Sequence, residues 1–200
     1  MKQATMIIFI LIAIIIVGGL SAYIYSRGAK ALEGSSFLPF FSWSFWILVA
    51  TFIVGQIFER GDPGMFAITI SRIGSISLAF FLYLLLFTFF VDIVRVFQHF
   101  FHFIPESFTT GILSGKMLFI YGISIAGLVT LGGSVNALNP IVNEFNISID
   151  KRDAKRNSLK VVLATDVHLG VMLGRNHAQK LVTQINEQNP DIVIFGGDLV

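Results

Sequence analysis

The chain has 200 residues, of which 54% are hydrophobic and only 13% charged, whereas about 25% of an average soluble domain is charged. Its formal net charge is only +2, so its basic pI does not indicate a nucleic-acid partner. The absence of cysteine excludes disulfides, thiolate metal ligands and cysteine nucleophiles. Any catalytic chemistry must therefore use oxygen and imidazole groups.

Four apolar segments are each long enough to cross a hydrocarbon core of about 30 Å, which takes about 20 residues of helix. Each segment is bounded by charged residues and contains none. The segments cover approximately residues 6–25, 40–58, 73–91 and 117–135. We therefore predict an α-helical membrane anchor over residues 1–136, with four transmembrane helices. This predicts a multi-pass protein of the cell membrane that is in contact with the lipid bilayer.

The first segment has a second interpretation, as a secretory signal, because Ala29 and Ala31 form an A-x-A pattern after it. A retained helix fits better, because the apolar run exceeds the roughly 7–15 residues of a signal and three more spans follow. A transporter or channel would need ionisable residues inside the spans, and the sequence has none there. Asp92 and Arg95, at the end of the third span, are interpreted as an interfacial helix pair.

The basic residues in the loops indicate an orientation in the membrane. If the N-terminus is cytoplasmic, seven of them lie on the cytoplasmic side (Lys2, Arg60, Arg72, Lys151, Arg152, Lys155 and Arg156). Four lie on the outer side (Arg27, Lys30, Arg95 and Lys116). This difference favours a cytoplasmic C-terminal domain. An extracytoplasmic domain is the alternative, because one miscounted span would reverse the result.

The character of the sequence changes after Asn136. Phe145, Ile147 and Ile149 alternate with polar residues, which is the period of a half-buried strand. The segment 150–157 is a polar turn with four basic residues. Residues 137–158 are therefore predicted to be a linker that contains the first strand.

Residues 159–165 form a short apolar, β-branched run that predicts a strand buried on both faces. Between residues 176 and 188, apolar positions spaced i, i+3, i+4 and i+7 predict an amphipathic helix. Residues 191–195 predict a second buried strand. A strand, a helix and a strand over about 40 residues predict a βαβ unit with parallel strands.

Acidic residues and a histidine follow the two predicted strands. Asp166 and His168 come directly after the first strand, and Asp198 follows the second. Each residue alone has an ordinary structural explanation, as a helix cap, a loop histidine or a strand end. Together they predict a cluster of two carboxylates and an imidazole, because the carboxyl ends of parallel strands meet at one edge of a sheet. This set of ligands suits Mn, Fe, Zn or a similar divalent ion.

Residues 159–200 resemble the start of the calcineurin-like metallophosphoesterase family. The resemblance rests on an apolar strand ending in D-x-H, then Leu169-Gly170, a helix, and a Pro-Asp dipeptide before an apolar strand that ends in Gly197-Asp198. Four spans ahead of such a domain resemble the membrane-bound members. The resemblance implies a four-layer α/β/β/α sandwich with two divalent metal ions. On this match Asp166 and His168 bind the first ion, and Asp198 bridges both.

The same resemblance implies a membrane-anchored hydrolase of phosphomonoester, phosphodiester or pyrophosphate bonds, which uses a hydroxide that bridges the metals. Its substrate would be a phosphate ester, and the membrane setting favours a lipid-linked one. The family's other motifs, which include the catalytic histidine, are expected beyond Val200. Residues 1–200 alone are therefore expected to be inactive.

Two alternatives remain. The first is a catalytically silent membrane or interaction protein that keeps the fold without a complete metal site. The second, nucleotide binding, is disfavoured because neither predicted strand is followed by G-x-G-x-x-G or G-K-[ST]. Arg175 and His177, near the predicted helix start, are interpreted as part of a solvated first turn.

Overall fold

The structure is a computed structural model of the chain, and it describes residues 2–58, 64–149, 158–170 and 173–199. The chain divides into two compact units, Met1–Gly132 and Gly133–Val200. We call the first the helical unit and the second the sheet unit.

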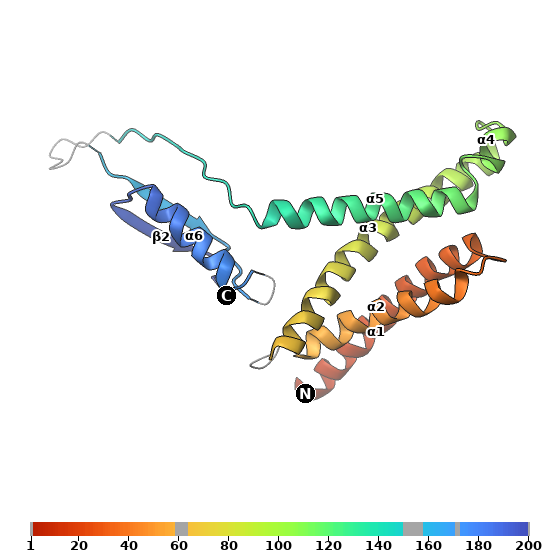
Figure 1. Ribbon diagram of the computed structural model, residues 1–200, viewed down its shortest axis with the longest axis horizontal. Helices are drawn as coiled ribbons and strands as arrows, with labels where there is room; N and C mark the ends of the chain where they lie inside the picture. Colours follow the sequence, from red (N-terminus) through yellow and green to blue (C-terminus); the bar gives the residue numbers. More distant parts are fainter. Residues whose placement is uncertain (1, 59–63, 150–157, 171–172, 200) are drawn as a thin grey trace. The chain divides into compact units, whose positions relative to one another are not determined.

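The helices of the helical unit follow each other through short connections (Figure 1). They are α1 (Lys2–Ala31), α2 (Leu38–Phe58), α3 (Met65–Phe101), the short α4 (Glu106–Thr110) and α5 (Gly115–Ala137), which continues into the sheet unit. Helix α3 has 37 residues and is therefore about 55 Å long. It ends at Phe101, and the capping residue His102 has a left-handed backbone and donates its N–H to the carbonyl of Gln98. The charged residues predicted to bound the third span lie inside this helix and do not end it.

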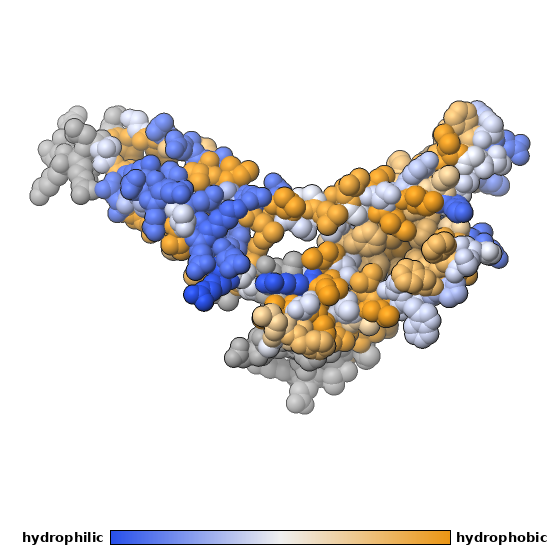
Figure 2. All heavy atoms as spheres, viewed as in Figure 1, coloured by the Kyte–Doolittle hydropathy of each residue, from blue (hydrophilic) through white to orange (hydrophobic). Residues whose placement is uncertain are grey.

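Three helices among the described residues are long and apolar enough to cross a membrane. They are α2 over Leu38–Gly55, α3 over Met65–Phe101 and α5 over Gly115–Ala137, and they contain the second, third and fourth predicted spans. The first predicted span, residues 6–25, lies within α1, where several side chains fall outside the described residues, and stays a prediction. Exposed apolar side chains cover much of these helices (Figure 2). Such a surface indicates association with a membrane.

The helices share a small apolar core. Its buried members come from all four long helices: Ile24, Phe45, Val49, Leu84 and Ala126. Aromatic rings extend this core, with the ring of Phe45 centred 4.9 Å from that of Phe81. Because α1, α2, α3 and α5 each supply a buried residue, the core fixes these helices against each other.

A glycine in α3 allows the backbones of α2 and α3 to approach each other closely. A Cβ atom added to Gly74 of α3 would lie 2.6 Å from the carbonyl oxygen of Thr51 and 2.8 Å from the Cα of Phe52. One turn away, the hydroxyl of Ser71 donates a 3.0 Å hydrogen bond to the carbonyl of Gly55. Small residues that allow backbones to approach and to hydrogen-bond are typical of helix pairs in membranes.

The sheet unit contains β1 (Val161–Thr165), α6 (Arg175–Glu187) and β2 (Ile192–Gly196). The two strands pair in parallel, from Val161 beside Ile192 to Thr165 beside Gly196. All three elements lie within two residues of their predicted bounds. The larger four-layer sandwich stays a prediction.

One expectation for this unit is wrong. Residues 141–149 form neither helix nor strand, and Phe145, Ile147 and Ile149 are 79–84% exposed. A segment with alternating apolar and polar residues forms a strand only when it pairs with another strand. The sheet of the described residues contains only β1 and β2, which pair with each other. Leu163 and Phe195 of the strands are more than half exposed, so burial of the strands on both faces stays a prediction for the larger sandwich. A single helix cannot cover both faces of a sheet.

The close contact at Gly74 leads to a prediction. Gly74→Ala should lower the stability of the helical unit by about 1–3 kcal/mol, because the added methyl group meets the backbone of α2, which cannot rotate away. Gly127→Ala is the matched control, because a Cβ at Gly127 meets no atom within 4 Å. Thermal unfolding of both variants in the same detergent would test this. An unchanged midpoint for Gly74→Ala would contradict the close approach.

Candidate metal centre

The predicted ligands lie where the two strands end. Asp166 follows β1 directly, and Asp198 lies two residues after the end of β2. Because β1 and β2 are parallel, their carboxyl ends lie at the same edge of the sheet. This is the edge at which ligands gather in open α/β sheets.

The backbone pairing continues past both strands. The N–H of Asp166 donates to the carbonyl of Gly196 at 3.0 Å, and that of His168 donates to the carbonyl of Asp198 at 3.2 Å. The N–H of Leu169 then donates to Leu199 at 2.8 Å. The segment after β1 therefore runs beside the segment after β2, and the backbone of His168 lies next to that of Asp198.

The segment after β1 has an unusual backbone. Asp166 has φ 50° and His168 has φ 47°, in the left-handed region that few residues other than glycine occupy. Val167 between them is buried, with 8% of its surface exposed. Such conformations cost about 1–3 kcal/mol each and concentrate at functional sites. The buried Val167 and the hydrogen bonds on both sides hold this segment in place.

Gly197 fits against the carboxylate of Asp166. The N–H of Asp198 donates to Oδ1 of Asp166 at 3.4 Å. A Cβ atom on Gly197 would contact the same oxygen and would lie 2.8 Å from Cγ of Asp166. Gly197 also has φ 69°. Both the space and the backbone angle therefore require glycine at this position.

The three predicted ligands are neighbours in the backbone, but their side chains do not converge. Asp166, His168 and Asp198 are all exposed. Among the described residues, no group of three or more Asp, Glu or His side chains could hold a metal ion. Two carboxylates and an imidazole are suitable ligands for Mn, Fe or Zn, and they share one edge of the sheet. Their role as metal ligands stays a prediction.

One histidine differs from its interpretation in the sequence. His177 lies in the first turn of α6, and its Nδ1 atom is buried without a hydrogen-bond partner among the described residues. It was expected in a solvated turn. A buried polar atom without a partner costs about 1–3 kcal/mol. Nothing in the residue pattern indicates this burial, because one histidine beside polar residues is typical of an exposed turn.

Comparisons with known proteins give a partial match. No family model matches the chain, and no solved structure matches it. A zebrafish (Danio rerio) protein named transmembrane protein with metallophosphoesterase domain is 37% identical over 81 residues, which is 40% of this chain and 18% of that protein. An uncharacterized metallophosphoesterase of Campylobacter jejuni is 29% identical over 85 residues, which is 42% of this chain and 22% of that protein.

A third relative extends the similarity into the helices. A Caenorhabditis elegans protein, also named as a metallophosphoesterase, is 27% identical over 148 residues, which is 72% of this chain and 30% of that protein. This match is longer than the whole sheet unit, Gly133–Val200, so it includes part of the helical unit. The chain spans less than a third of the length of each of these relatives.

These relatives confirm the resemblance that the D-x-H and G-D motifs indicate. Several curated relatives of this chain are named metallophosphoesterases, and they match part of it. Together with the apolar helices, these names support a membrane metallophosphoesterase-like protein.

The fit between Gly197 and Asp166 can be tested by substitution. Gly197→Ala should strain the backbone at residue 197 by about 1 kcal/mol or more and so weaken the pairing of the two segments. Amide hydrogen exchange at residues 166–169 and 196–199 should therefore become at least about fivefold faster. Gly170→Ala should leave the exchange unchanged, because a Cβ at Gly170 meets no atom within 4 Å. Equal exchange in the two variants would show that Gly197 is not in this contact.

Proposed function

We propose that the protein is a membrane-anchored, metal-dependent phosphoesterase whose metal ligands include Asp166, His168 and Asp198. The observation that supports this most is the backbone pairing beyond β1 and β2, which brings His168 beside Asp198. In this proposal residues 1–136 are the anchor, and residues 159–200 belong to the catalytic domain.

Each of the three residues has a separate role in the proposal. Asp166 and His168 would bind one divalent ion, and Asp198 would bridge it to a second. Carboxylates suit this bridging role because each offers two oxygens to the ions. Two ions bound there would supply an activated water and would neutralise charge on the phosphoryl oxygens.

The remaining features of this edge position the ligands. The left-handed backbone at Asp166 and His168, with Val167 buried between them, sets the spacing of the carboxylate and the imidazole. The lack of a Cβ at Gly197 makes room for the carboxylate of Asp166, which keeps this ligand at the edge of the sheet. The three side chains would still have to turn toward a common point when metal binds, because among the described residues they form no metal-binding group.

The substrate and the orientation are further parts of the proposal. The apolar helices keep the sheet unit near a membrane, which favours a lipid-linked phosphate ester as the substrate. The larger number of basic residues on the side of the sheet unit, seven against four, favours the cytoplasm over the extracytoplasmic side.

A catalytically silent membrane protein with the same fold is the second candidate. One observation favours it, because the exposed side chains of Asp166, His168 and Asp198 form no metal-binding group among the described residues. The two candidates differ in whether the protein binds divalent metal.

The ligand role of Asp198 can be tested in the full-length protein. Asp198→Asn should reduce both the bound metal and the metal-dependent hydrolysis of a phosphodiester by at least about 100-fold, since even residues behind the ligands change metal affinity or activity by about 10–100-fold. Metal content by mass spectrometry and turnover of bis(4-nitrophenyl) phosphate are the two measurements.

Glu187→Gln is the control for this test. Glu187 is an exposed carboxylate at the end of α6, so its substitution makes the same charge change away from the edge of the sheet. Metal binding and turnover should match those of the unchanged protein. Unchanged turnover in Asp198→Asn would rule out the proposed role, and a wild-type protein without metal or turnover would favour the silent candidate.

A further inference from the structure

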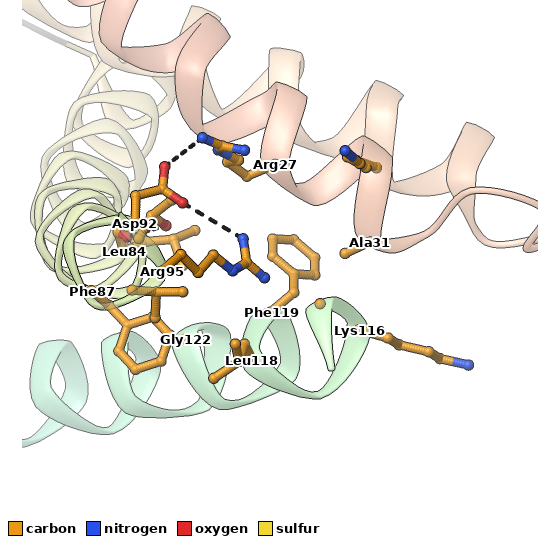
Figure 3. A pocket seen from close by; sticks show the side chains of 14 residues that line it. Arg27, Ala31, Leu84, Phe87, Asp92, Arg95, Lys116, Leu118, Phe119 and Gly122 are labelled. Carbon is orange, nitrogen blue, oxygen red and sulfur yellow. Dashed lines mark hydrogen bonds and ion pairs between the residues drawn. The ribbon is translucent and has the colours of Figure 1, made fainter. Parts of the chain in front are cut away.

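A pocket with several basic side chains lies in the helical unit, at the C-terminal end of α1 and the N-terminal end of α5 (Figure 3). We call it the basic pocket, and its volume is about 590 Å³. Its charged lining residues are Arg27, Lys30, Asp92, Arg95 and Lys116. Its apolar wall comes from α3 and α5 and includes Leu84, Phe87, Val91, Leu118 and Phe119.

The positive charges in this pocket are not balanced. Four basic side chains and one carboxylate line it, which leaves a formal charge of +3. The carboxylate of Asp92 lies 2.6 Å from Arg27 and 3.5 Å from Arg95. It also accepts a 2.6 Å hydrogen bond from the hydroxyl of Tyr23. Asp92 therefore holds the two guanidinium groups in place but cannot neutralise all four cations.

The two lysines supply the charge that remains. In the part of the chain that the structure describes, neither Lys30 nor Lys116 forms an ion pair with a carboxylate. Figure 3 shows Arg27 and Arg95 directed toward Asp92, while the side chain of Lys116 extends away from them. Arg27 and Arg95 are nearly half exposed, at 42% and 46%, whereas Asp92 is only 19% exposed. The pocket therefore presents cations to a ligand and keeps its carboxylate inside.

The chemistry of the lining limits the class of ligand. Guanidinium groups bind phosphate through paired hydrogen bonds, and lysine adds charge. The apolar wall beside them suits a hydrocarbon chain. A ligand that satisfies both parts is an amphipathic anion with a phosphate group.

The position of the pocket along the helices agrees with such a ligand. Arg27 and Lys30 follow the apolar part of α1, and Arg95 follows the apolar middle of α3. Lys116 is the second residue of α5. Charged residues that bound apolar spans lie at the level of lipid headgroups. Basic side chains at that level suit an anionic headgroup through their charge and their hydrogen-bond donors.

We propose that the basic pocket binds the phosphate headgroup of one anionic phospholipid, with its acyl chains along α3 and α5. This site shares no residue with the edge that carries Asp166, His168 and Asp198. It therefore does not depend on the proposed enzymatic function, and the protein can have either site without the other.

The test compares lipid retention in variants of the full chain. The protein is purified in mixed micelles that contain phosphatidylglycerol and phosphatidylcholine, and native mass spectrometry counts the lipids that remain bound. The variant Lys30→Gln with Lys116→Gln removes two charges and leaves the Arg27–Asp92–Arg95 cluster unchanged. Each lysine near a headgroup contributes about a fivefold gain in affinity, so the double variant should bind phosphatidylglycerol about 30-fold more weakly.

Two control variants separate charge from folding. Lys30→Arg with Lys116→Arg keeps both charges and should retain the lipid. Lys160→Gln removes an exposed lysine of the sheet unit and should also retain it. A second arm adds inorganic phosphate, which distinguishes a lipid headgroup from a free phosphate ion.

Retention of one phosphatidylglycerol by the wild type and by both controls, with loss in the double glutamine variant, would support the proposal. Equal retention in all four proteins would overturn it. Retention of phosphatidylcholine to the same extent would also overturn it, because that lipid carries no net charge. Displacement of the lipid by millimolar inorganic phosphate would assign the pocket to free phosphate and overturn the lipid assignment.

Discussion

The parallel pairing of β1 with β2 is the constraint on which the candidate metal centre depends. Because the hydrogen bonds continue from Asp166 to Leu169 on one side and from Gly196 to Leu199 on the other, the segments after the two strands cannot separate. Gly197 allows the carboxylate of Asp166 to lie against the second segment. Residues 30 positions apart in the sequence are thereby held at one edge of the sheet.

The helical unit is organised differently from the sheet unit. Its surface is apolar, and the charged residues of its basic pocket lie near the ends of the apolar helical segments. Glycine lets the helices come close enough to bring those ends together. A Cβ on Gly28 of α1 would lie 2.7 Å from the ring of Phe119 of α5, so α1 and α5 meet where Arg27 and Lys116 line the basic pocket. The four basic residues that are predicted from the sequence to lie on one side of the membrane thus line one cavity.

The sequence predicted that Asp166, His168 and Asp198 follow the two strands because strand period is a local property of residue types. The order strand, helix, strand then implied that the two strands are parallel. It did not predict the left-handed backbone at Asp166 and His168, since such angles depend on the neighbouring segment. The strand expected at Phe145 to Ile149 was wrong for a related reason, because alternation alone does not supply a partner. The basic pocket was also not predicted, because its residues come from three helices. How these helices pack against each other cannot be inferred from local sequence patterns.

The central claim is that Asp166, His168 and Asp198 bind metal together, and diffraction at the zinc absorption edge tests it most directly. Crystals of the full-length protein grown with Zn²⁺ should show an anomalous peak within about 2.0–2.2 Å of a carboxylate oxygen of Asp166 and of Asp198 and of a ring nitrogen of His168. Zinc bound only at other places, with these three side chains turned to solvent, would contradict the claim.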